Sequence, residues 1–240
     1  MADNGTVPGL TLSMIVKNEA DRYLRRMLKS AREYITDAVI IDDGSTDDTV
    51  ALCHDMLGAV PHKIIENGES CFHSEWRLRR QQWTETIATD PDWILFLDAD
   101  EIFEDGFKTG VKELISNRSN SVYLFRLYDF WDEEHYREDG LWQAHKIYRP
   151  FMLRYDKNTR YTFNETDQHC GRMPANVFEL KYELSSYRLK HYGWADKNER
   201  TRKFKRYMDL DPKGQYGSLL QYISILDENP NLINWEDHEV

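Results

Sequence analysis

Two carboxylates separated by one residue stand where they could bind a metal ion. Asp98 and Asp100 flank Ala99, directly after the apolar run Trp93–Leu97. Two negative charges at short range are unfavourable unless a positive charge lies between them. A hard divalent cation such as Mn²⁺ or Mg²⁺ meets this need, because it prefers oxygen ligands and substrate phosphates. The sequence therefore favours a divalent metal site here over the alternative, a solvated loop after a strand.

A second acidic cluster follows an earlier apolar run. Asp42 and Asp43 come directly after Ala38–Ile41. Carboxylates at such positions accept hydrogen bonds from a base N–H or a ribose hydroxyl in dinucleotide-binding α/β folds. Asp43 is the first candidate for this role and Asp42 the second. The alternative is a turn and helix cap, which Ser45 and Asp47 could supply alone.

The elements that must position these clusters alternate between strand and helix. The expected strands cover Leu10–Val16, Ala38–Ile41, Lys63–Glu66 and Trp93–Leu97, and the expected helices cover Ala20–Tyr34, 47–57 and Ser74–Thr89. This order predicts an α/β fold with a mostly parallel central sheet flanked by helices. Ligands bind at the carboxyl ends of the strands in such sheets. Lys17-Asn18-Glu19, Asp42-Asp43 and Asp98-Ala99-Asp100 are therefore expected to meet at one edge.

The pattern changes after Glu101 and predicts a smaller antiparallel part. A helix is expected over Gly110–Asn117, and strand-like segments over Ser121–Phe130, Trp142–Leu153 and Val177–Leu189. A basic helix is expected over Asn198–Leu210, followed by an acidic, proline-interrupted tail from Asn229 that we expect to be loosely packed. No linker composition demands a second domain. We expect a single domain over 1–240, with halves at 10–105 and 106–228 and a tail at 229–240.

Composition limits the classes of protein. The formal net charge of −11 argues against nucleic-acid binding. The three cysteines (Cys53, Cys71 and Cys170) contain no CxxC pair and indicate free thiols in a reducing cytoplasm. We see no signal peptide and no apolar stretch of membrane-spanning length, so we expect a soluble, cytoplasmic protein.

Three stretches together resemble a known family. TLSMIVKNEADRYLRRMLKS, VIIDDGSTDDT and DWILFLDADEIFE are similar, in order and at plausible spacing, to the start of family 2 glycosyltransferases with the GT-A fold. The resemblance covers roughly residues 10–105. It implies an inverting transferase that uses a nucleotide-sugar, often UDP-linked, together with Mn²⁺ or Mg²⁺.

The resemblance also implies roles for individual residues. The positions that it assigns to the nucleotide-sugar are Val16, Asn18, Glu19, Asp42, Asp43, Arg77, Arg80, Asp98 and Ala99. Among them, Asn18 and its neighbours would contact the base, Asp43 would read the base, and Asp42 would lie in the ribose region. Asp98 would face the ribose, and Asp100 would bind the metal.

Related transferases commonly place a histidine near the metal or diphosphate. His191, in His191-Tyr192-Gly193, is the candidate for that position. The alternative is an ordinary structural histidine.

A catalytic base is expected in the second half of the chain. Glycosyl transfer puts negative charge on the leaving diphosphate and requires a carboxylate or histidine to deprotonate the acceptor hydroxyl. The stretch Asn164–Gly171 offers Asp167 as the first choice, Glu165 as the second, and also His169. A polar loop without catalytic function is the alternative.

The segment Asp196–Arg206 is rich in lysine and arginine. It is interpreted first as a solvated helix face. The alternatives are closure over the diphosphate, docking on an anionic acceptor, or peripheral contact with the inner face of a membrane.

Two other functions remain to be separated from transfer. The QxxRW pattern of processive polysaccharide synthases is absent, which favours transfer of single sugars. A sugar-1-phosphate nucleotidyltransferase would normally have a glycine-rich basic loop after the first strand, where this chain reads VKNEAD. A non-catalytic nucleotide-sugar or carbohydrate-binding module would also suit the acidic clusters.

Overall fold

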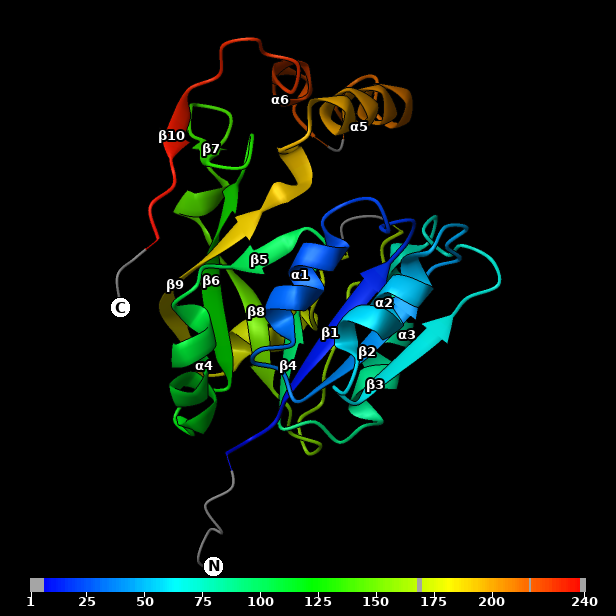
Figure 1. Cartoon of the computed structure of the whole chain (residues 1–240), viewed down its shortest axis with the longest axis vertical. Helices are drawn as coiled ribbons and strands as arrows, with labels where there is room; N and C mark the ends of the chain where they lie inside the picture. The colour runs from blue at the N-terminus through cyan, green and yellow to red at the C-terminus, as the bar shows by residue number, and fades with distance from the viewer. Residues whose placement is uncertain (1–6, 168–169, 216, 238–240) are drawn as a thin grey trace, which may run out of the picture.

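The computed structural model describes residues 7–167, 170–215 and 217–237. Figure 1 shows a twisted central sheet with helices against it. The strands are β1 (Leu10–Val16), β2 (Asp37–Asp42), β3 (His62–Glu66), β4 (Trp93–Phe96), β5 (Glu101–Phe103), β6 (Val122–Asp129), β7 (His135–Arg137), β8 (Tyr148–Arg154), β9 (Tyr182–His191) and β10 (Leu232–Asn234). The α-helices are α1 (Leu24–Ala31), α2 (Thr49–Leu57), α3 (Glu75–Ile87), α4 (Phe107–Ser116), α5 (Lys197–Leu210) and α6 (Leu219–Ser224).

The first half forms the parallel part of an eight-stranded sheet. β1 pairs in parallel with β2 and β4, and β2 pairs in parallel with β3. This confirms the predicted alternation of strands and helices. Helix α1 begins at Leu24 rather than at Ala20. The segment before Leu24 is bonded to the start of α2 instead, because the backbone N–H groups of Glu19 and Ala20 donate to the side chains of Thr49 and Asp47.

The second half continues the same sheet in mixed orientation. The full strand order is β3-β2-β1-β4-β8-β6-β9-β5. β8 pairs antiparallel with β4 and β6, and β5 pairs antiparallel with β9. β6 was expected to be antiparallel, and it is so toward β8 but runs parallel to β9. Strands β5, β7 and β10 are too short to show a periodic pattern in the sequence, and β10 and β7 form a small antiparallel sheet of their own.

Apolar side chains cover both faces of the sheet. Within β4, Trp93 and Leu95 face a core that includes residues of α1 and α2, whereas Ile94 and Phe96 face a core that includes Trp83 of α3. The alternation follows from the two-residue repeat of a strand. It confirms that the apolar run before Asp98 is a central strand buried on both faces.

The tail from Asn229 is not loosely packed, so that prediction is wrong. Strand β10 pairs with β7, and Trp235 packs against Tyr128 at 5.1 Å between ring centroids. The guanidinium of Arg188 lies 3.9 Å from the centre of the Trp235 ring, a cation–π contact. One partly buried aromatic anchor outweighs the acidic, proline-containing composition on which the prediction depended. Figure 1 shows the tail running beside β7 and β9.

Among the described residues, no helix has the length and apolar character needed to cross a membrane.

Candidate active site

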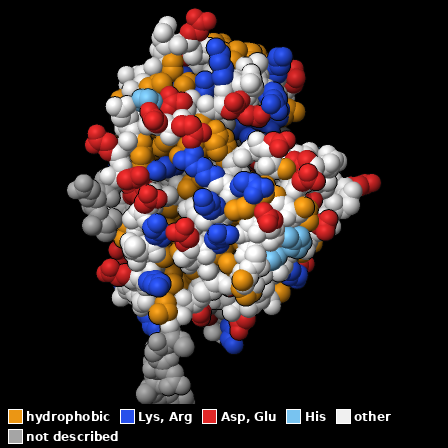
Figure 2. Space-filling view, in the orientation of Figure 1, with side chains coloured by type: hydrophobic (Ala, Val, Ile, Leu, Met, Phe, Trp, Pro, Cys, Tyr) orange, Lys and Arg blue, Asp and Glu red, His pale blue; other side chains and the backbone are white. Residues whose placement is uncertain are grey.

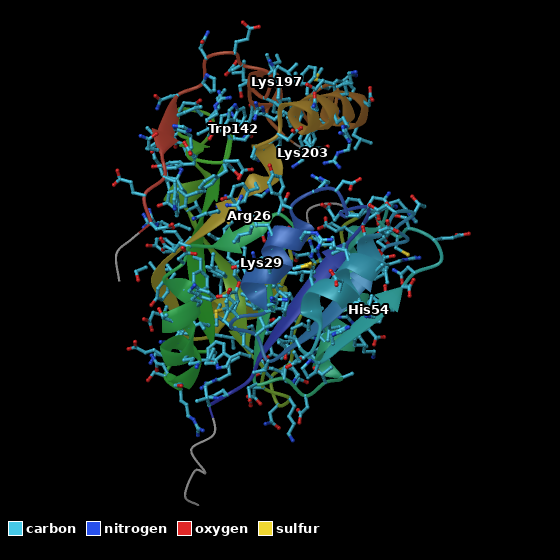
Figure 3. All side chains as sticks on the ribbon, viewed as in Figure 1. Arg26, Lys29, His54, Trp142, Lys197 and Lys203 are labelled. Carbon is cyan, nitrogen blue, oxygen red and sulfur yellow. The ribbon has the colours of Figure 1, made fainter. Side chains whose placement is uncertain are left out.

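A pocket of about 500 Å³ lies at the carboxyl ends of β1 and β4. Side chains from these strand ends, from α3, from the end of β9 and from α5 line it. Both halves of the chain therefore line one pocket, which lies at the carboxyl ends of strands, where ligands bind in such sheets. Figure 3 shows Lys203 on the side of α5 that faces the sheet.

Asp98 belongs to a network of charges just after β4. Arg172 donates to both oxygens of Glu101, at 2.5 and 2.8 Å, and to Asp98 at 3.1 Å. Burial opposes ionisation of Asp98, but the guanidinium groups of Arg172 and Arg79 outweigh it and hold its pKa below the ordinary value. Glu101 is almost fully buried, and burial raises its pKa against the influence of Arg172. The network keeps Asp98 ionised and fixes its position.

Helix α3 presents Arg79 to the pocket. The guanidinium of Arg79 lies 3.7 Å from Asp98 and 3.6 Å from Glu75. Its Nε atom is buried and has no hydrogen-bond partner among the described residues. A buried donor without a partner is costly, so this atom is suited to an anionic ligand.

Arg77 and Arg80, the two arginines predicted for the nucleotide, do not line this pocket. Arg77 lies over the ring of Trp76, at 5.3 Å, and Arg80 over the ring of Phe163, at 4.7 Å. Successive residues of a helix point about 100° apart, so adjacent arginines cannot share one direction. The structure places Arg79, rather than its neighbours, at the site.

Asp100 and His191 approach each other at the end of the pocket. Oδ2 of Asp100 lies 3.7 Å from Nε2 of His191. Nδ1 of His191 lies 2.7 Å from Asp129, a carboxylate acceptor, so Nδ1 carries a proton and Nε2 faces Asp100. Burial lowers the pKa of His191, but the carboxylates of Asp100 and Asp129 outweigh it and hold the pKa above its ordinary value.

The backbone at Gly193 leaves a small space between these side chains. A β-carbon at Gly193 would lie 2.5 Å from Nε2 of His191 and 2.7 Å from Oδ2 of Asp100. It would also lie 2.7 Å from Nζ of Lys203. A side chain at this position would therefore push the three groups apart.

The residues around this space fit a divalent ion that is shared with a substrate. A carboxylate and an imidazole are both ligand types that Mn²⁺ accepts. Among the described residues, no three side chains of His, Cys, Asp or Glu are grouped so that they could hold a metal ion. Asp100 and His191 would supply two ligands, and phosphate oxygens and water would supply the others.

The end of β1 reaches the same pocket. Val16 and Glu19 line it, as does Ala99 from the connection after β4. Asn18 does not line it. Its backbone is in the left-handed region at φ 52°, and its side chain accepts a 2.8 Å hydrogen bond from the backbone of Thr46. Asn18 therefore joins the end of β1 to the loop after β2.

Glu19 is a partly buried carboxylate at the pocket wall. Burial raises the pKa of Glu19 to about 7, although an ion pair with Arg22 at 2.7 Å opposes this. The Oε2 atom of Glu19 and the Nε atom of Arg22 are buried without hydrogen-bond partners among the described residues. Like Nε of Arg79, these atoms are buried donors or acceptors at the pocket that no described residue satisfies.

Asp42 and Asp43 are buried and bonded to nearby loops. Asp42 accepts a 2.9 Å bond from the backbone of Ser45 and a second bond from its hydroxyl. Asp43 accepts bonds from the hydroxyl of Ser70 at 2.6 Å and the backbone of Cys71 at 2.7 Å. The structure does not bring either carboxylate to the pocket wall. For Asp42 the arrangement matches the alternative of a turn.

A larger groove of about 790 Å³ adjoins the pocket, and Phe72, Glu75 and Arg206 line both. Asp167 lines this groove and accepts a 2.9 Å bond from the hydroxyl of Ser74. Glu165 is exposed and lines neither space. His169 lies outside the described residues.

Helix α5 covers one side of the pocket. Lys203 and Arg206, one turn apart, both line the pocket. Lys203 is half-buried, donates to the carbonyl of Gly193 at 2.6 Å, and has its pKa lowered by burial against the influence of Asp100. Figure 2 shows Lys and Arg side chains interspersed with acidic ones on this face, rather than forming one extended basic surface.

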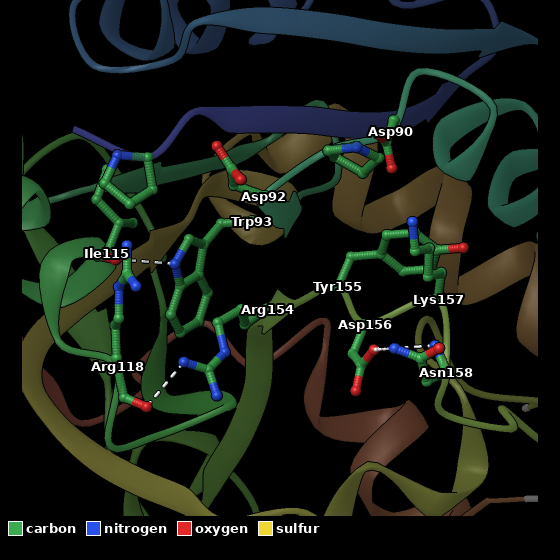
Figure 4. A pocket seen from close by; sticks show the side chains of 12 residues that line it. Asp90, Asp92, Trp93, Ile115, Arg118, Arg154, Tyr155, Asp156, Lys157 and Asn158 are labelled. Atoms are coloured by element: carbon green, nitrogen blue, oxygen red, sulfur yellow. Dashed lines mark hydrogen bonds between the residues drawn. The ribbon is translucent and has the colours of Figure 1, made fainter. Parts of the chain in front are cut away.

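Another pocket, of about 410 Å³, lies at the opposite edge of the sheet (Figure 4). Several of its polar groups are bonded within the chain. Nε1 of Trp93 donates to the carbonyl of Ile115 at 2.9 Å, and Arg154 donates to the carbonyl of Arg118 at 2.7 Å. It lies at the amino end of β4, away from the strand ends where ligands bind in such sheets.

The geometry defines a polar pocket at the carboxyl ends of β1 and β4, and the sequence shows the family. The chain belongs to glycosyl transferase family 2: residues 11–178 match the family described as "Glycosyl transferase family 2". It is 29% identical over 111 residues to an uncharacterized glycosyltransferase of Rickettsia felis, covering 46% of this chain and 35% of the relative. It is 22% identical over 222 residues to an uncharacterized protein of Mycobacterium tuberculosis, covering 88% of this chain and 53% of the relative. The chain thus spans about half or less of these relatives' length.

Solved structures share the fold. The crystal structure of S. aureus TarS superposes with a TM-score of 0.59 at 12% identity, covering 91% of this chain and 42% of that chain. A shorter TarS structure, in complex with UDP-GlcNAc, gives a TM-score of 0.54 at 12% identity, covering 91% and 70%. The fold is GT-A, as the resemblance implied.

Sequence reasoning missed three side chains of the site: Arg79, Arg172 and Glu75. The helical phase of α3 could have singled out Arg79, because Glu75 and Arg79 are four residues apart and share a face. Arg172 lies in a connection without periodic structure, and no local signal marks it.

Proposed function

We propose that this chain transfers a single sugar from a UDP-sugar to an acceptor hydroxyl, with inversion at the anomeric carbon and with a bound divalent metal. The observation that carries the proposal is the pocket at the end of β4. There, Asp98, Asp100 and His191 lie among the cationic side chains of Arg79, Lys203 and Arg206.

The cations suit the diphosphate of the donor. Arg79 lies on the α3 side of the pocket, and Lys203 and Arg206 lie on the α5 side. Cations on two sides of a diphosphate stabilise the charge that develops as it leaves. Of the interpretations of the basic helix, we therefore propose closure over the diphosphate rather than docking on a membrane.

When bound, Mn²⁺ or Mg²⁺ supplies charge neutralisation to the leaving diphosphate. Asp100 and His191 would hold it, and Asp129 orients His191 through the 2.7 Å bond to Nδ1. Asp98, held ionised by Arg172, would accept hydrogen bonds from the ribose. UDP and UDP-GlcNAc are present in structures of TarS, and this supports a UDP-linked donor.

The transfer step exchanges one bond at the anomeric carbon for another. The acceptor oxygen bonds to that carbon from the face opposite the diphosphate, the bond to the diphosphate breaks, and the hydroxyl proton moves to a carboxylate. We propose Asp167 as that base, because it lines the adjoining groove and Glu165 does not. Glu75, which lines both spaces, is the competing carboxylate.

The test is release of UDP. The purified chain is incubated with UDP-glucose, UDP-galactose or UDP-GlcNAc and Mn²⁺, and free UDP is measured with time. At least one donor should release UDP, and Asp100→Ala should abolish the release while the protein remains folded. Tight binding of every donor without release would support the binding module. Pyrophosphate release from UTP and a sugar-1-phosphate would support the nucleotidyltransferase.

The base is tested separately. Asp167→Asn should keep affinity for the UDP-sugar and lose transfer, whereas Glu75→Gln should keep a substantial part of transfer. The reverse result would assign the base to Glu75.

A further inference from the structure

We call the pocket at the carboxyl ends of β1 and β4 the donor pocket, after its proposed function. The groove beside it has a continuous aromatic wall. Trp142 and Trp194 lie 5.0 Å apart between ring centroids, Trp194 and Tyr207 lie 6.4 Å apart, and Tyr207 and Tyr222 stack at 5.0 Å with only 10° between their planes. All four line the groove. They come from α5, α6, the 3₁₀ turn Tyr192–Trp194 and the segment before β8, so distant parts of the chain converge on this wall.

The wall is held in place and is accessible. Nε1 of Trp142 donates to the hydroxyl of Ser224 at 2.9 Å, and the hydroxyl of Tyr222 donates to Asp211 at 3.0 Å. Trp142 is almost completely buried, whereas Trp194, Tyr207 and Tyr222 are half-buried. Anchored rings that keep part of their surface exposed lose little conformational entropy when a ligand stacks on them. Figure 3 shows Trp142 close to the α5–α6 region.

The groove also contains acidic and amide groups. Asp167, Asp211 and Gln221 line it together with the aromatic rings. Asp211 is buried and accepts hydrogen bonds from the backbone of Gln215 and Gly217. Asp167 is exposed, and a hydrocarbon chain in the groove would remove water from its carboxylate without replacing the lost hydrogen bonds. An anionic ligand would be repelled by Asp167, and the cation that lines the groove, Arg206, also lines the neighbouring pocket. A neutral sugar meets both requirements, because its ring presents an apolar C–H face and its hydroxyls donate to carboxylates.

The position of the groove indicates which substrate such a sugar would belong to. Arg206 lines both spaces, and its guanidinium lies 5.4 Å from the centre of the Tyr207 ring. A sugar on the aromatic wall would therefore lie next to the donor site. We propose that the groove binds a neutral sugar residue of the acceptor against the half-buried rings of Tyr207 and Tyr222, so that the acceptor of this transferase is a carbohydrate. This inference rests on the proposed function.

Saturation-transfer difference NMR on the whole chain, in the presence of Mg²⁺ and UDP, tests the inference. The probes are the methyl glycosides of glucose, galactose, mannose and N-acetylglucosamine. At least one should show saturation of its ring C–H protons. That signal should fall at least fivefold in Tyr207→Ala and Tyr222→Ala. It should be retained in Tyr222→Phe, which keeps the ring, and in Tyr182→Ala, which removes a tyrosine that is 49% exposed outside the groove.

Three outcomes would overturn the inference. The first is the absence of saturation for every glycoside, and the second is an equal signal in wild type and both alanine variants. The third is saturation of the alkyl chain of octyl glucoside without saturation of its sugar ring. Melting temperatures show whether the variants are folded, and Tyr222→Phe keeps the test valid if Tyr222→Ala is not. The UDP resonances in the same spectra report on the donor pocket. If UDP gives a saturation-transfer signal and no glycoside does, only the sugar site in the groove is contradicted. If UDP gives no signal, the proposed UDP-linked donor is contradicted.

Discussion

The donor pocket and the adjoining groove are neighbours with different chemistry. The donor pocket combines carboxylates with arginine and lysine, and several of its buried polar atoms have no partner among the described residues. The groove is lined by tryptophan and tyrosine, and the polar groups of Trp142 and Tyr222 are bonded within the chain. This difference indicates that the donor pocket suits a charged ligand and the groove suits a neutral one. Each of the following changes tests that contrast.

Removing Arg172 should have the largest effect. Arg172→Ala would leave Glu101, only 2% exposed, as a buried charge without its bidentate partner. Breaking such a pair costs about 3–5 kcal/mol, and we expect a loss of at least ~3 kcal/mol in the free energy of unfolding. Urea denaturation measures it, with the exposed Arg160→Ala as the control. Equal losses in the two variants would show that the charge network does not hold the pocket.

Glu19 should make stability depend on pH. Its pKa is raised from 4.5 to about 7, so the folded state binds its proton more tightly than the unfolded state does. The stabilisation is complete below about pH 4.5 and is lost as the pH rises through about 7. As the pH rises from about 5 to about 8, the ionisation of Glu19 should lower the free energy of unfolding by on the order of 2 kcal/mol. Glu19→Gln should lack that part of the pH dependence. The same dependence in both proteins would contradict the account.

A side chain at Gly193 should damage the donor pocket more than the fold. The new β-carbon of Gly193→Ala would displace the ends of His191, Asp100 and Lys203. We expect metal-dependent UDP affinity to fall about tenfold, or ~1.4 kcal/mol, with little change in melting temperature. Gly140→Ala is the matched control, because no atom lies within 4 Å of its new β-carbon. Unchanged UDP affinity in Gly193→Ala would remove this space from the site.

The arginines of α3 give the smallest contrast. Arg79→Ala should weaken UDP binding about fivefold, the loss of one charge-assisted hydrogen bond in a partly exposed pocket. Arg77→Ala and Arg80→Ala should leave affinity unchanged, because these side chains lie over Trp76 and Phe163. Isothermal titration of UDP into the three variants shows whether Arg79, or instead Arg77 or Arg80, contacts the nucleotide. A larger loss in Arg77→Ala or Arg80→Ala would favour the prediction from the sequence.

The sequence predicted the donor edge better than the groove, for a physical reason. Strand ends in a parallel sheet meet at one edge, so Glu19, Asp98 and Asp100 could be brought together by topology alone. Asp43 could not be placed in this way, because its carboxylate bonds to Ser70 and Cys71 in a loop without periodicity.

The groove depended on contacts that no local pattern encodes. Trp142 and Tyr222 are 80 positions apart and line the same groove, where Trp142 is bonded to Ser224 of α6. The short strand β10 and its Trp235 anchor were missed for the same reason, since three residues cannot show a strand period.

The most direct test of the central claim is the metal dependence of UDP binding. Isothermal titration of UDP into the wild-type chain and Asp100→Ala, each with Mn²⁺ and with EDTA, measures it. The account predicts that Mn²⁺ strengthens UDP binding to the wild type and has no effect on Asp100→Ala. Equal UDP affinity in all four titrations, or no binding by the wild type, would contradict the assignment of this pocket to a nucleotide-sugar.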